Sequence, residues 1–167
     1  MRMKTPIPEE DIRSGQMGKE TKKLIEEGKI SELDFEVAQI LYKINERYNI
    51  SAASFYKALD IGSAVLILTK GEAGVLIGKD GKIVSEISSS LGKKVRIVET
   101  KGDLKKTIAD IIIPAKLIGI NRVYSSGTEI VKIRMPKHDL PKLPMDLPAL
   151  EKALRALVGH EIKLELE

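Results

Sequence analysis

Apolar residues recur at helical spacing between residues 32 and 48, and this spacing predicts an amphipathic helix. One side of that helix carries the apolar residues Leu33, Val37, Ile40, Leu41, Ile44 and Tyr48. Ser31 and Asp34 stand at the spacing of a capping box, which marks the start of the helix. The pattern therefore predicts one long helix that buries a single apolar stripe.

The chain before this helix has a weaker pattern. Residues 1–17 show no period and predict an irregular arm. Residues 19–27 can form a short helix that stops at Gly28. The N-terminal part, residues 1–30, is therefore treated as an arm separate from the units that follow.

The pattern after residue 52 changes from helical to extended and back. Residues 63–69 are almost wholly apolar, which is typical of a central strand buried on both faces. A tight turn at residues 60–62 joins this strand to the one before it. The predicted order is strand 53–59, strand 63–69, helix 72–78, helix 82–92 and strand 93–100.

The second half of the chain predicts a similar set of elements. Their order is a linking helix 103–117 that ends near Pro114, strands 119–125 and 128–135, a proline-rich stretch 136–148, helix 149–159 and strand 160–167. A constant shift that brings Gly92 onto Gly159 also brings Ile87 onto Leu154. The same shift brings the strand residues Ala64, Leu66 and Leu68 onto Val131, Ile133 and Met135. Either one small α/β unit occurs twice, or two amphipathic patterns match by chance.

The stretch VLIGKDGKIV, residues 75–84, interrupts an apolar run with two glycines and two opposite charges. Gly78 and Gly81 permit a turn that residues with a Cβ resist, between the end of one helix and the start of the next. A new helix presents unpaired N–H groups that suit a phosphate, and Lys79 and Lys82 add positive charge. Beside the loop, a shallow groove for unstacked bases is predicted along Val75, Ile77, Val84, Val95 and Ile97.

Composition narrows the classes of function for the 167 residues. The chain has no cysteine, and its two histidines are isolated, so neither a metal site nor a nucleophilic triad is predicted. No P-loop or dinucleotide fingerprint occurs, so we expect no enzyme, no cofactor and no small-molecule substrate. No apolar run is long enough for a membrane span, no secretory signal is visible, and the predicted location is the cytoplasm. The net charge of +4 permits a polyanionic partner.

The loop and its flanks resemble the KH domain, whose signature is a GxxG turn between two helices. The leading helix and two strands before the turn resemble the type II arrangement of that family. More closely, residues 71–100 with the helix that follows resemble the first KH unit of the NusA transcription elongation factor family in its short archaeal form. The resemblance is strongest over residues 60–120, and it does not extend to residues 1–30.

The resemblance implies an α/β (α+β) fold of two consecutive type II KH-like units, each a small sheet packed on helices. The implied domains are an N-terminal arm 1–30, a first KH domain 31–117 and a degenerate second KH-like domain 118–167. Related archaeal proteins carry paired cysteines in an N-terminal zinc knuckle. Because this chain has no cysteine, the arm would be a metal-free remnant of that knuckle.

The resemblance also implies a function in transcription elongation or termination, with single-stranded RNA as the ligand. In KH domains the GxxG loop clamps about four nucleotides. The predicted RNA-binding residues are Ile77, Gly78, Lys79, Asp80, Gly81, Lys82, Val84, Lys93, Lys94 and Arg96. Between residues 63 and 100 the six basic and four acidic residues leave a charge of only +2, so modest, salt-sensitive binding is expected.

Two departures from the KH pattern leave a second hypothesis open. Asp80 places a negative charge where a phosphate should pass, unless it caps the helix that follows. In the second unit Met145 and Pro148 replace the two glycines. The alternative is a protein-interaction module that docks on RNA polymerase or the ribosome with little RNA affinity. The basic residues of strand 93–100 are then simply a solvated strand end.

Overall fold

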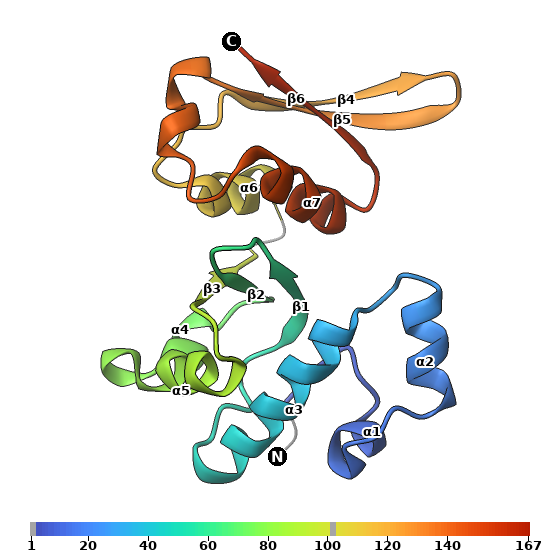
Figure 1. Ribbon diagram of the computed structural model, residues 1–167, viewed down its shortest axis with the longest axis vertical. Coiled ribbons are helices and arrows are strands. Elements are labelled where there is room, and N and C mark those ends of the chain that lie inside the picture. The colour runs from blue at the N-terminus through green and yellow to red at the C-terminus, as the bar shows by residue number, and fades with distance from the viewer. Residues whose placement is uncertain (1–2, 101–102) are drawn as a thin grey trace. The chain divides into compact units, whose positions relative to one another are not determined.

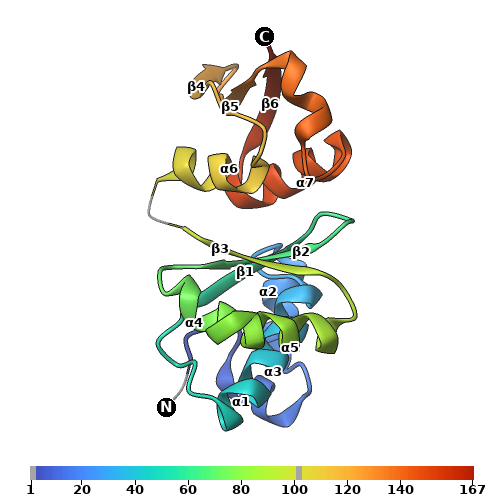
Figure 2. The same cartoon turned by 90° about the vertical axis from the view of Figure 1, so that its left-hand side faces the viewer.

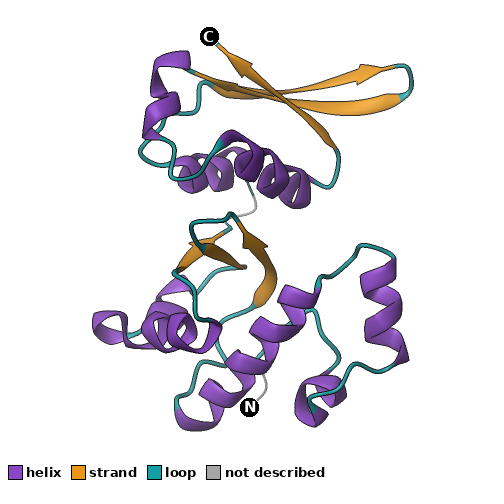
Figure 3. Ribbon diagram, viewed as in Figure 1, coloured by secondary structure: helices purple, strands orange, loops and turns teal. Residues whose placement is uncertain are grey.

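The computed structural model of the protein describes residues 3–100 and 103–167, and it divides the chain into two compact units (Figure 1). The first unit comprises the chain up to Leu59 together with Ala64–Glu99. The second comprises Asp60–Ser63 together with the chain from Thr100 to Glu167. Each unit combines one three-stranded sheet with helices (Figure 3).

The first unit contains six of the helical segments described here. They and the strands are α1 (Glu9–Ser14), α2 (Lys19–Glu26), α3 (Glu32–Arg47), β1 (Phe55–Asp60), β2 (Val65–Thr69), α4 (Ala73–Ile77), a 3-10 turn (Lys79–Gly81), α5 (Lys82–Leu91) and β3 (Val95–Glu99). The sheet order is β1-β2-β3, and β2 runs parallel to β3. Strand β2 is buried along its whole length, as its apolar sequence predicts.

The core of the first unit lies between its helices and one face of the sheet (Figure 2). The apolar stripe of α3 is buried there, with Val37, Ala38 and Leu41 fully inaccessible to solvent. Val65 and Ile67 of β2 complete this core from the sheet side. The helix predicted over residues 32–48 and its capping box are both confirmed, because Ser31 and Asp34 exchange both hydrogen bonds of the box.

The N-terminal arm folds onto the first unit. Ile7 and Ile12 are buried in the core, and the Phe55 N–H donates to the Lys4 carbonyl over 3.0 Å. The Asp11 carboxylate joins α1 to α2, since it accepts hydrogen bonds from the Thr21 hydroxyl and the Gly18 N–H. These bonds, that of Thr21 first, lower the pKa of Asp11. Helix α1 was not predicted, because so short a segment does not establish a helical period in the sequence.

The second unit repeats the element order of the first. Its elements are α6 (Leu104–Ile112), β4 (Gly119–Ser125), β5 (Thr128–Met135), a 3-10 segment (Lys137–Lys142), α7 (Leu147–Val158) and β6 (Glu161–Leu166). The strand order is β4-β5-β6, and β5 and β6 are parallel. Strands β4 and β5 have the predicted bounds. Among the described residues, no helix is long and apolar enough to cross a membrane.

Helix α6 belongs to the second unit, whereas the sequence pattern placed it as a linker at the end of domain 31–117. Its apolar face is the physical reason, because Ile108, Ile111 and Ile112 are fully buried. Figures 1 and 2 show α6 beside α7 on the same side of the β4-β5-β6 sheet. Helix α6 therefore opens the second unit before β4 and β5, as α3 precedes β1 and β2 in the first unit.

The helix and strand that close each unit confirm the internal repeat. Gly92 and Gly159 end α5 and α7 in the same left-handed conformation, with φ of 70° and 75°. Ile87 and Leu154, which the repeat aligns, are both fully buried. The fold is therefore two KH-like units of the same topology in tandem.

The strand register corrects one detail of the repeat. Val65 pairs with Val95 in the first unit, and Val131 pairs with Ile162 in the second. The separation along the chain is longer by a single position in the second pair. Because the shift that relates Gly92 to Gly159 also relates Val95 to Ile162, the equivalent of Val131 is Val65 and not Ala64. The second unit thus carries one insertion between these two strands.

Asp139 stabilises the connection between β5 and α7. Its buried carboxylate accepts a hydrogen bond from the Lys116 N–H over 2.9 Å, and Lys142 Nζ lies 3.3 Å from its other oxygen. The Lys116 hydrogen bond, and then Lys142, hold the pKa of Asp139 below its usual value.

A carboxyl group with a lowered pKa in the folded state stabilises the fold above its unfolded pKa, and it stops doing so as pH falls through the folded value. Asp139→Asn should therefore lower the free energy of unfolding of the second unit at pH 7. The difference from wild type should shrink as pH falls below 3.8. Urea titrations at pH 7 and in acid measure this difference in stability, with amide hydrogen exchange of β5 as the probe of the second unit. An equal difference at both pH values would contradict it.

Candidate nucleic-acid interface

The GKDG loop is a tight turn in which three of four residues have positive φ. Gly78, Asp80 and Gly81 have φ of 77°, 56° and 73°. The Gly78 N–H closes α4 by donating to the Gly74 carbonyl, and the Gly81 N–H donates to the Gly78 carbonyl over 3.1 Å. Helix α5 then starts at once at Lys82. The sequence predicted that these two glycines permit a turn that residues with a Cβ resist, and both have positive φ in the structure.

Gly78 also allows a close approach that no other residue permits. A Cβ built on Gly78 would lie 2.5 Å from Ile83 Cγ1 and 2.9 Å from the Ile83 backbone nitrogen. Ile83 is buried in the core of the first unit, so it has no room to move away. The loop is therefore pressed against the first turn of α5.

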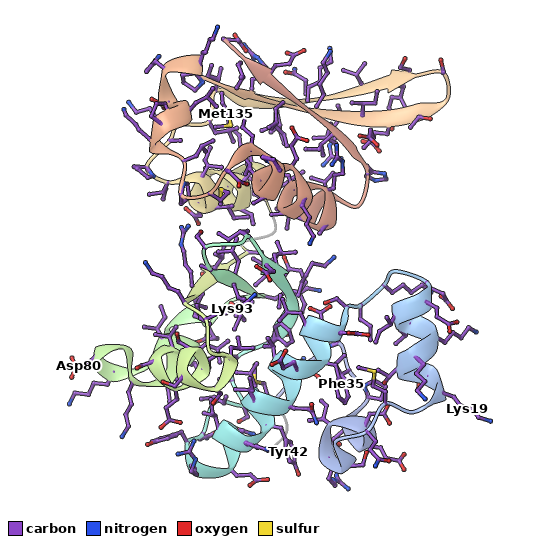
Figure 4. The ribbon with its side chains drawn as sticks, viewed as in Figure 1. Lys19, Phe35, Tyr42, Asp80, Lys93 and Met135 are labelled. Atoms are coloured by element: carbon purple, nitrogen blue, oxygen red, sulfur yellow. The ribbon has the colours of Figure 1, made fainter. Side chains whose placement is uncertain are left out.

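The N-terminus of α5 has Gly81 as its N-cap, and no side chain in the described part of the chain caps it. Its first N–H group, that of Lys82, donates to the Lys79 carbonyl. The hypothesis that Asp80 caps this helix is therefore wrong. Figure 4 shows Asp80 at the tip of the loop, with its side chain directed away from the unit. The positive end of the helix dipole favours an anion here.

The two lysines of the loop have different surroundings. Lys79 is exposed and makes no ion pair with any residue that the structure describes. Lys82 directs its ammonium group toward Tyr48, with Nζ 4.8 Å from the ring centroid. The hydrogen bond with Tyr48 raises the pKa of Lys82. Lys79 is therefore the loop's unrestrained cation, and Lys82 is held.

Apolar side chains beside the loop are only partly covered. Ile77 is 40% exposed and Val84 is half-buried. Val75, Val95 and Ile97 are also half-buried, and they pack against the core of the unit. Helices α4 and α5 both contact β3, which is the edge strand of its sheet. The residues predicted to line a groove therefore lie on these two helices and on β3.

The three basic residues predicted on strand 93–100 do not gather at the loop. Lys93, labelled in Figure 4, and Lys94 are exposed at the C-terminal end of α5. This end is about 15 Å from the loop, because α5 has 10 residues. Arg96 pairs with Leu66 and so lies on the face of the sheet opposite to Val95 and Ile97. The strand pattern alone did not show which face the groove would use.

Two residues that position the loop were not predicted. The Glu99 carboxylate accepts a hydrogen bond from the Ala73 N–H over 3.0 Å and so joins the end of β3 to the start of α4. Tyr48 was predicted only as part of the apolar stripe of α3. Both contacts join residues that are far apart in the sequence, and no local motif signals them.

The loop of the second unit is closed by the chain itself. Helix α7 begins after Asp146, whose carboxylate accepts a hydrogen bond from the Ala149 N–H over 2.9 Å. Met145, which replaces the first glycine, is buried, and Pro148 lies within the first turn of α7. The end of α7 that corresponds to the open end of α5 is therefore already capped.

The comparisons with known proteins agree with this geometry. Residues 18–100 match the family model of the NusA-like first KH domain. A probable transcription termination protein NusA of Methanocaldococcus jannaschii is 33% identical over 96 residues, which are 56% of this chain and 52% of that protein. Its counterpart in Methanococcus vannielii is 36% identical over 53 residues, 32% of this chain and 31% of that protein.

A solved structure of the protein APE1850 shares the fold. It superposes with a TM-score of 0.55 at 23% identity and covers 76% of this chain and 96% of that one. The match to the Methanocaldococcus jannaschii protein spans about half of that protein's length, and the other match spans about a third. This chain is therefore a NusA-like KH family protein, whose first KH domain lies within residues 18–100.

Proposed function

We propose that this protein binds single-stranded RNA through the GKDG loop of its first unit and acts in the cytoplasm in transcription elongation or termination. Its role is binding, not catalysis. The names of its NusA relatives, which describe termination proteins, support the process. The observation that carries the proposal is the N-terminus of α5, which follows the GKDG turn directly and has no side-chain cap.

The loop supplies three contributions to this binding. The positive dipole end of α5, which no described side chain caps, attracts a phosphate. Lys79 adds a positive charge that is not committed to an ion pair among the described residues. Bases lie against Ile77 and Val84, whose apolar surfaces are partly exposed beside the loop. Lys93 and Lys94 extend contact only to RNA long enough to follow α5.

Asp80 limits the affinity of the loop. Its exposed carboxylate does not cap α5, and it lies beside the proposed phosphate position. An exposed carboxylate beside a phosphate weakens binding by about 1 kcal/mol or less, and salt screens this repulsion. We therefore expect modest affinity that falls as the salt concentration rises.

The test is the binding of fluorescent random-sequence single-stranded RNA, measured by anisotropy at several salt concentrations. Lys79→Asp should lower the affinity roughly tenfold and reduce the salt dependence of log K by about 0.7, because one phosphate contact is lost. Lys19→Asp is the matched control, since it makes the same charge change at an exposed lysine on α2. Equal losses in the two variants would mean that only net charge matters.

The second candidate is a KH-fold module that docks on RNA polymerase or the ribosome and has little RNA affinity. The negative charge of Asp80 at the loop tip and the capped helix of the second unit favour it. If wild type fails to bind RNA at low salt, and nuclease-treated RNA polymerase or ribosomes still bind the protein, this candidate replaces the first.

A further inference from the structure

The C-terminal end of α3 lies against the start of α5, and Tyr48 occupies the contact. Tyr48 is the first residue after α3, and its N–H closes the helix by donating to the Ile44 carbonyl over 2.8 Å. Its ring is half-buried against the core of the first unit. The ring therefore has a fixed position relative to the first turn of α5.

Two cations approach this one ring. Lys82 Nζ lies 4.8 Å from the centroid, and the Arg47 guanidinium carbon lies 5.5 Å from it. Arg47 is in turn held by Glu86, one helical turn beyond Lys82, with 2.6 Å between Nη2 and Oε2. Glu86 thus compensates the charge of Arg47, and Lys82 is the nearer of the two cations to the Tyr48 ring. The hydrogen bond with Tyr48 is also the main reason that the pKa of Lys82 is raised.

We propose that Tyr48 is a positioning residue for RNA binding: it holds the Lys82 ammonium group beside the open N-terminus of α5. This inference rests on the proposed function. An unrestrained lysine loses much of its rotamer entropy when a ligand orders it. Lys82 already lies against the ring, so its charge contributes to the phosphate site with a smaller entropic loss. Lys79 and Lys82 are thus a mobile and a fixed cation on one loop.

The test is a double-mutant cycle of Tyr48→Leu and Lys82→Met, read by RNA anisotropy. Tyr48→Phe, which keeps the ring and its packing, is the conservative control, and circular dichroism checks that every variant keeps the fold. Tyr48→Leu should lower RNA affinity roughly two- to fivefold in the wild-type background, because the contact between the ring and the ammonium group is lost, and Tyr48→Phe should not. In the Lys82→Met background Tyr48→Leu should have no effect. An equal loss in both backgrounds would overturn the proposal, because Tyr48 would then act independently of Lys82.

A second measurement needs no RNA. The Hε protons of Lys82 near the ring should show a ring-current shift in the proton spectrum. Tyr48→Phe should largely keep it and Tyr48→Leu should abolish it. Absence of the shift in wild type would overturn the positioning role directly. If Lys79→Asp lowers affinity but the cycle shows no coupling, only this inference fails. If wild type does not bind RNA, the proposed function fails, whatever the Lys82 spectrum shows.

Discussion

Replacing Gly78 with alanine is expected to destabilise the first unit by about 2–4 kcal/mol and to abolish RNA binding. Two physical costs add at this residue. Its φ of 77° is unfavourable for any residue with a Cβ, and the new methyl group would lie 2.5 Å from Ile83 Cγ1. Because Ile83 is part of the buried core, relief of the clash requires α5 to shift. Urea unfolding of the whole chain, with amide hydrogen exchange in α5 as the probe, measures the lost stability of the first unit.

Gly81→Ala is the matched control for this prediction. Gly81 has nearly the same φ, 73°, but its nearest neighbour to a Cβ is Val84 Cγ1 at 3.8 Å, an ordinary contact. This variant should lose only the conformational cost, about 1–2 kcal/mol. The difference between the two variants combines two costs: the approach to Ile83 and the less favourable backbone of Gly78, whose ψ is 170° where that of Gly81 is 18°. Equal destabilisation would show that neither cost affects stability.

Asp34→Ala is expected to destabilise the first unit by about 2–3 kcal/mol. The buried carboxylate accepts hydrogen bonds from the Ser31 N–H over 2.9 Å and the Ala58 N–H over 2.7 Å. It thus joins the start of α3 to β1, and its removal leaves the Ala58 N–H of a buried residue without this acceptor. Burial raises the pKa of Asp34, and the hydrogen bonds from Ala58 and Ser31 act in the opposite direction. Removing the buried charge therefore offsets part of the lost stability.

Ser31→Ala separates the cap from the strand contact. This change removes the hydroxyl that accepts from the Asp34 N–H and leaves the bond to Ala58, so about 1 kcal/mol should be lost. The double variant should lose less than the sum, because both residues form one capping box. Chemical unfolding of the three variants measures these values. A loss for Asp34→Ala no greater than that for Ser31→Ala would show that the bond to Ala58 contributes nothing.

Patterns that are local in the sequence predicted most of the fold. Helix α3, the buried strand β2 and the glycines that end α4 and α5 follow from spacing and from residue type alone. The GKDG loop was equally accessible, because the need for positive φ is a property of the loop itself. The degenerate second loop was visible for the same reason, since Pro148 and Met145 stand where glycines would be.

Features that depend on contacts between distant residues were not predictable. The face of β3 that carries Arg96 depends on which side the helices cover, and a single strand does not contain that information. The insertion between β5 and β6 shifts the register without disturbing either apolar pattern. Helix α6 was assigned to the first domain because its isoleucines indicate a buried face but do not indicate which sheet that face packs against.

The Asp146 cap has a consequence for any attempt to restore binding in the second unit. A carboxylate tethered to the helix competes with every anion in solution at a very high effective concentration. Introducing GxxG glycines at residues 145 and 148 alone would therefore leave the site self-inhibited. Asp146 would also have to be replaced before the second unit could bind a phosphate of another molecule.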